Sequence, residues 1–126
     1  DRAEHIEEVI KKNKNNTIIS DRSMISGIAY ASALSIDKLI ELNLIATSNI
    51  LPTHVILLEL TPSELKCRLS QKENDSIELR GIDYLINIQN RMKETIKRLN
   101  INHIFIDADL KIEEIEKRIE DFIYAK

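Results

Sequence analysis

Three short apolar runs stand out in this chain, at residues 17–20, 54–60 and 103–106. Each has the length and β-branched character of a buried strand in a parallel sheet. Between the runs lie longer segments whose apolar residues recur at i, i+3 and i+4, the spacing of one helix face. This spacing predicts helices at about residues 3–12, 24–34, 35–50, 62–70 and 77–99, and a last helix that ends at about residue 124.

The predicted order is helix, strand, helices, strand, helices, strand, helix. Strands separated by long helical segments favour a parallel sheet with right-handed crossovers. The chain is therefore expected to be a single α/β domain, a three-layer parallel sheet with helices on both faces. Three strands are few for such a sheet, so further strands are expected upstream of Asp1.

Two of the predicted helices carry additional signals. Thr61, Pro62 and Glu64 supply an N-cap, a first-turn proline and a capping-box acid for the helix at residues 62–70. The segment 35–50, expected to end at Pro52, is apolar on more than one face. That pattern is typical of a helix packed between a sheet and a second subunit.

Composition and charge narrow the class of protein. Of the 126 residues, 43% are apolar and 31% charged, and the net charge is -3. No large basic field is available for nucleic acid or a membrane surface, and no apolar run approaches the about 20 residues of a membrane helix. The single cysteine, Cys67, excludes an internal disulfide and favours the cytoplasm. The three histidines lie on separate elements and predict no zinc site.

Candidate chemistry begins at Asp21 and Arg22, directly after the first apolar run. In open α/β sheets the carboxyl ends of the strands form the ligand crevice. An arginine there suits a phosphate, because its planar fork donates two parallel hydrogen bonds. The alternative is a salt bridge that only ties the strand to the following helix.

Several segments, in order, resemble the thymidylate kinase family in its bacterial form. They are DRAEH at residues 1–5, ISDRSMISGIAY at 19–30, LPTHVILLELTPSELKCRL at 51–69, ENDSIE at 73–78 and IFIDAD at 104–109. The resemblance implies a P-loop kinase-type fold without its first strands. Residues 1–126 would form the C-terminal two thirds of a single nucleoside monophosphate kinase domain, with a lid at about 66–78. The family's GxxxxGKS/T loop has no counterpart in these residues.

The family resemblance also implies an activity. The intact protein would transfer the γ-phosphoryl group of ATP to dTMP, giving dTDP, with Mg²⁺ as cofactor, and would form a homodimer. By this resemblance Arg22 holds the acceptor phosphate and steadies the transition state, Asp21 orients Mg²⁺ through water, and Arg2 reaches the acceptor site. Ser26, Gly27 and Tyr30 would contact the acceptor nucleotide, although each has a purely structural alternative.

Two departures from the family pattern concern the same site. Ser23 stands where many members have tyrosine, and Ser76 replaces an arginine at the lid exit. Arg68 and Lys72 then remain as the cations expected to contact ATP. The alternative function is a non-catalytic α/β module that binds a nucleotide or a partner.

Overall fold

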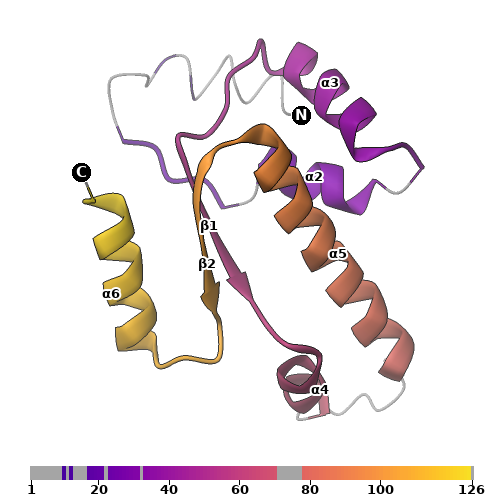
Figure 1. The fold of residues 1–126 in the computed structure, drawn as a ribbon, viewed down its shortest axis with the longest axis vertical. Helices are drawn as coiled ribbons and strands as arrows, with labels where there is room; N and C mark the ends of the chain where they lie inside the picture. The colour runs from indigo at the N-terminus through magenta and orange to yellow at the C-terminus, as the bar shows by residue number, and fades with distance from the viewer. Residues whose placement is uncertain are drawn as a thin grey trace.

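The computed structural model describes residues 10, 12, 17–21, 23–31, 33–70 and 78–125 (Figure 1). In chain order these residues form α2 (Met24–Tyr30), α3 (Ile36–Ala46), β1 (His54–Glu59), α4 (Pro62–Ser70), α5 (Glu78–Leu99), β2 (Asn102–Asp107) and α6 (Ile112–Ile123). The predicted alternation of helices and strands after residue 23 is confirmed. Most of the helix predicted at residues 3–12, and the polar link at 71–76, lie outside the described residues.

The two strands are parallel neighbours. Their register pairs His54 with Asn102 at one end and Glu59 with Asp107 at the other. The crossover between them contains α4 and α5, as predicted for a parallel pair. Both strands therefore end at the same edge of the sheet, close to α4 (Figure 1).

Helices cover both faces of this sheet, as the α/β prediction requires. Val55, Leu57 and Phe105 pack against the core formed with α5 on one face. On the other face His54 makes an edge contact with Phe122 of α6, with ring centroids 5.3 Å apart. Figure 1 shows α5 and α6 on opposite sides of the strands.

The best buried core lies on the α5 side of the sheet, between α2, α3 and α5. Ile28 and Ile96 are completely inaccessible to solvent, and they belong to one cluster with Met24, Ile25, Ile36 and Leu39. Three of these six residues belong to α2, so this helix is positioned by packing against α3 and α5.

None of the described helices combines the length and apolar character that crossing a membrane would require.

The strand predicted at residues 17–20 is wrong for this structure. These residues have no regular secondary structure, and Ile19 is 91% exposed. A strand is held by ladder hydrogen bonds to a neighbour, and β1 and β2 pair only with each other among the described residues. Without such a neighbour, an apolar run of four residues does not adopt strand structure. Asp21 accordingly follows an irregular segment and not a buried strand.

Two helices are shorter than predicted. Helix α2 ends at Tyr30, and α3 ends at Ala46, well before Pro52. The α3 terminus is set by Ser48 and Asn49, whose φ angles are 55° and 62°. These left-handed residues let the Asn49 N–H donate to the Leu44 carbonyl at 2.8 Å, which closes the helix end.

The predicted start of α4 is confirmed. The Glu64 N–H donates to Thr61 Oγ1 at 3.2 Å, and the Thr61 N–H donates to Glu64 Oε2 at 3.3 Å. This reciprocal pair is a capping box, and it satisfies two backbone donors that the helix itself leaves unpaired.

Candidate functional site

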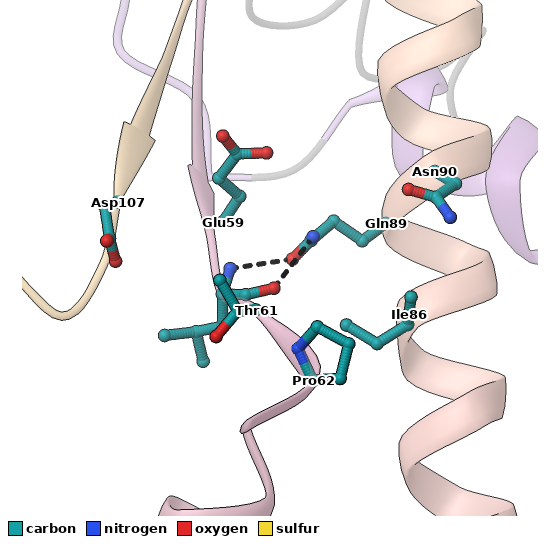
Figure 2. A pocket seen from close by; sticks show the side chains of 8 residues that line it. Glu59, Thr61, Pro62, Ile86, Gln89, Asn90 and Asp107 are labelled. Atoms are coloured by element: carbon teal, nitrogen blue, oxygen red, sulfur yellow. Dashed lines mark hydrogen bonds between the residues drawn. The ribbon is translucent and has the colours of Figure 1, made fainter. Parts of the chain in front are cut away.

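A pocket of about 250 Å³ lies at the carboxyl ends of β1 and β2 (Figure 2). Its wall includes Glu59 and Asp107, the last residues of the two strands, together with the turn into α4 and one side of α5. The complete lining is Glu59, Leu60, Thr61, Pro62, Ile86, Gln89, Asn90 and Asp107. This is the edge of a parallel α/β sheet at which ligands bind.

Gln89 fixes the turn that leaves β1. Its Nε2 donates to the Leu60 carbonyl at 3.0 Å, and its Oε1 accepts from the Leu60 N–H at 2.9 Å. Figure 2 shows this side chain reaching from α5 to the chain just after the strand. The amide therefore pairs with the backbone as a neighbouring strand would. It holds α5 to the beginning of α4.

The two strand-end carboxylates have different partners. Glu59 forms an ion pair with Lys93 of α5, with Oε2 and Nζ 2.7 Å apart, and both side chains are more than two thirds buried. Asp107 accepts from the Asp109 N–H at 2.8 Å through Oδ1, which shapes the turn after β2. Glu59 therefore binds β1 to α5 through its ion pair, whereas Asp107 stabilises the turn at the pocket rim.

Arg68, predicted to contact ATP, joins α4 to that same loop. Its Nη2 donates to the Ala108 carbonyl at 2.8 Å and lies 3.7 Å from Asp109 Oδ1. The Arg68 side chain remains half exposed to solvent. A planar cation held in this way can stack on an aromatic base.

Helix α2 brings three predicted acceptor-site residues to one face. Ser26, Gly27 and Tyr30 follow Ser23 at the i+3, i+4 and i+7 positions, and all are more exposed than the residues that face the core. Ser23 is the N-cap of α2 and accepts from the Ile25 N–H at 3.3 Å. The serine at this departure from the family pattern therefore has a local structural role.

The side chains on this face differ in what they contact. Ser26 Oγ donates to the Ser23 carbonyl at 3.2 Å. This bond to the backbone of its own segment is the structural alternative to a contact with the nucleotide. Tyr30 is 42% exposed and packs against Tyr84 of α5, with ring centroids 6.4 Å apart, so it is not an ordinary core residue. Gly27 has a negative φ and is half-buried within the helix. Asp21 is exposed and makes no ion pair with another described residue.

Three of the predicted site residues, Arg2, Arg22 and Lys72, lie outside the described residues. Of the remaining predicted residues, the structure groups Ser26, Gly27 and Tyr30 on one face of α2. It holds Arg68 elsewhere, against the loop after β2. Among the described residues no group of three or more His, Cys, Asp or Glu side chains could hold a metal ion.

Sequence reasoning missed the α5 side chains that organise this site. Gln89, Arg91 and Lys93 contact, in turn, the β1–α4 turn, the end of α2 and Glu59. Their i, i+2, i+4 spacing on a charged helix resembles an ordinary solvated surface. No signal in the sequence marks these side chains, because their contacts depend on the packing of distant segments.

Comparison with known proteins was made for the whole chain. The family model described as Thymidylate kinase matches residues 1–119. The chain belongs to the thymidylate kinase family. Similar proteins include the thymidylate kinase of Aliarcobacter butzleri, 82% identical over 126 residues, which cover all of this chain and 67% of that protein. The thymidylate kinases of Nautilia profundicola and Wolinella succinogenes are each 50% identical, over 98% and 94% of this chain and 64% and 63% of their own lengths.

This result confirms the resemblance drawn from the ordered segments. The described architecture, a parallel strand pair with helices on both faces, is that expected for part of a P-loop kinase-type α/β fold. The chain spans about two thirds of the length of these relatives.

Proposed function

We propose that the intact protein is a thymidylate kinase, which transfers the γ-phosphoryl group of ATP to dTMP to give dTDP. The observation that carries this proposal is the family match over residues 1–119, together with identities of 50% and above to thymidylate kinases. The pocket at the carboxyl ends of both strands supports it, because substrates of α/β enzymes bind at that edge.

On the acceptor side, the proposed contacts come from α2 and the residues before it. Ser26, Gly27 and Tyr30 share the accessible face of α2, which supports their assignment to the acceptor nucleotide. Arg22 and Arg2 are assigned through the family resemblance. Arg22 would hold the acceptor phosphate and stabilise charge in the transition state, where phosphoryl transfer depends on positioning and positive charge.

On the donor side, Arg68 is assigned to the adenine of ATP, and Lys72 to its phosphates. The half-exposed Arg68 side chain, held against the loop after β2, supports a stacking role. We propose that residues 1–126 are the C-terminal two thirds of a single nucleoside monophosphate kinase domain. In that domain the segment at about 66–78, which includes both cations, is the lid.

Asp21 fits a role in binding Mg²⁺. Its carboxylate is exposed, and carboxylate oxygens are ligands that suit a hard cation. Mg²⁺ keeps several waters and is bound through one or two carboxylates together with substrate phosphates. Asp21 would orient the ion through such a water. The ion would supply positive charge that offsets the charge of the phosphates.

We further propose that the protein is a cytoplasmic homodimer that binds neither nucleic acid nor membranes. Helix α3 buries Ile36 and Leu39 toward the core, while Leu42 and Ile45 on its other side are 47% and 72% exposed. Such a second apolar face suits a partner subunit. The single cysteine and the net charge of -3 support the remaining assignments.

The test is turnover by the full-length protein with ATP and Mg²⁺ across dTMP, dUMP, dCMP, dAMP and dGMP. Selective ADP release with dTMP is the expected result. Turnover with another monophosphate and not with dTMP would reassign the acceptor. An absence of turnover with all five would favour a non-catalytic nucleotide-binding module instead.

A further inference from the structure

The C-terminal end of α2 is held by a side chain from a different helix. Arg91 of α5 donates from Nε to the Ala29 carbonyl at 2.9 Å, and from Nη2 to the Ala31 and Ile28 carbonyls at 3.0 and 3.3 Å. These three oxygens all belong to the last turn of α2 and its C-cap. One guanidinium therefore binds three carbonyl oxygens at the C-terminal end of α2.

Helix α2 lacks the usual means of ending stably on its own. It is seven residues long, its last turn contains no basic residue, and its C-cap is Ala31 in an extended conformation. The last carbonyls of a helix have no intrahelical donors, and they carry the negative end of the helix dipole. The Ile28 carbonyl also accepts from the Ala31 N–H at 3.2 Å. Arg91 adds donors to the Ala29 and Ala31 carbonyls, together with the positive charge that the last turn of α2 lacks. Its planar fork also fixes direction, which an ammonium group does not.

The same side of α5 contacts the accessible face of α2. Tyr84, seven residues before Arg91, packs its ring against Tyr30. Arg91 and Tyr84 therefore lie two turns apart on one side of α5 and contact the end and the flank of α2. Together they define where α2 lies along α5 and how it is rotated about its own axis.

We infer that Arg91 is a positioning residue for the acceptor side of the reaction. It does not contact the acceptor nucleotide; it fixes the end and the rotation of the helix that presents Ser26, Gly27 and Tyr30. This inference rests on the proposed function, because it assigns the acceptor monophosphate to the α2 face. The ATP side depends on Arg68, which is anchored on the loop after β2 and not on α2.

The test compares KM values for the two substrates in the full-length protein. Arg91→Met removes every donor, and Arg91→Lys keeps the charge but loses the fork. Arg98→Met is the matched control, because Arg98 lies on the same helix and pairs with Asp37 and Glu94. Arg91→Met is expected to raise the KM for dTMP by roughly 10-fold, which corresponds to about 1.4 kcal/mol of lost binding free energy. The KM for ATP should stay within about twofold, since Arg68 is independently held.

Hydrogen exchange gives a second readout that does not depend on turnover. The amides of α2 should exchange faster in Arg91→Met than in Arg98→Met, with Arg91→Lys intermediate in both exchange and KM. If Arg91→Met fails to fold, the lysine variant carries the comparison.

The outcomes separate the two claims. Wild-type protein that does not phosphorylate dTMP would overturn the proposed function and this inference with it. Active wild-type protein whose Arg91 variants show an unchanged KM for dTMP, or equal increases for both substrates, would overturn the inference alone. Protected α2 amides in folded Arg91→Met would do the same.

Discussion

Among single side chains, Gln89 makes the most specific connection at the sheet edge, because one amide satisfies both backbone groups of Leu60. Replacement by leucine would leave a part-buried N–H and C=O without that partner. Such a loss costs about 1–3 kcal/mol of unfolding free energy. Urea unfolding of Gln89→Leu should show this decrease. Asn90→Leu, at the exposed neighbouring amide in the same pocket wall, should change stability by less than about 0.5 kcal/mol. Equal effects of the two variants would show that the Leu60 contacts contribute little.

A second prediction at this scale concerns Arg22. Removing one charged donor from a pre-organised site typically costs about 2.7–4 kcal/mol of transition-state stabilisation. Arg22→Ala in the full-length protein should therefore lower kcat/KM for dTMP by about 100-fold to 1,000-fold. Steady-state kinetics measures this directly. A kcat/KM equal to that of wild type would contradict the assignment of Arg22 to the acceptor phosphate.

Residues that could be predicted from the sequence are those whose role depends on near neighbours. Asp21, Ser26 and Tyr30 follow one another at fixed offsets within one family segment, and the structure places Ser26 and Tyr30 on one helix face. Arg91 and Gln89 could not be predicted, since each contacts a segment tens of residues away. Their partners become visible only once α5 is packed.

At the level of elements, the start of α4 should be sensitive to its cap. Thr61 supplies the side-chain oxygen of the capping box, and replacing such a threonine by alanine typically costs about 1 kcal/mol. Thermal or urea unfolding of Thr61→Ala should show that loss. Ser63→Ala, at an exposed position in the first turn of α4, serves as the control and should be close to neutral. A neutral Thr61→Ala would mean that packing of α4 on α5, and not the cap, determines this helix start.

The proposed homodimer can be tested on the exposed apolar face of helix α3. A charge at Ile45, which is 72% exposed, should weaken a dimer that buries this face. Ile45→Glu is expected to shift the full-length protein from dimer to monomer in light scattering coupled to size-exclusion chromatography. Ile112→Glu, at a 78% exposed isoleucine of α6, should leave the dimer intact. A wild-type monomer, or a dimer unaffected by Ile45→Glu, would contradict the α3 interface.

Features of single elements that depend on residues close in sequence were mostly predicted correctly, and those that depend on distant residues were not. The capping box of α4 is a local signal, and it is confirmed. The strand at residues 17–20 failed because a strand requires a neighbour that no nearby residue supplies. Helix α3 ended early because Ser48 and Asn49 adopt left-handed conformations, which outweigh the later signal from Pro52.

For the molecule as a whole, α5 is the element that connects the two sides of the proposed site. Arg91 on one of its sides holds α2, and Gln89 and Lys93 on a different side hold the turn into α4 and Glu59. A single 22-residue helix thereby relates the acceptor side to the carboxyl edge of the sheet. The class of fold could be predicted from the alternation of elements. This coupling through α5 could not, because it depends on which helix faces meet.

The central claim is that the intact protein transfers a phosphoryl group from ATP to dTMP. The most direct measurement supplies ATP labelled in its γ-phosphate, with Mg²⁺ and dTMP, to the full-length protein and follows the label. The label is expected to appear in dTDP, and Arg22→Ala is expected to slow its appearance greatly. Label found only in inorganic phosphate, or retained entirely in ATP, would contradict the assignment of this protein as a thymidylate kinase.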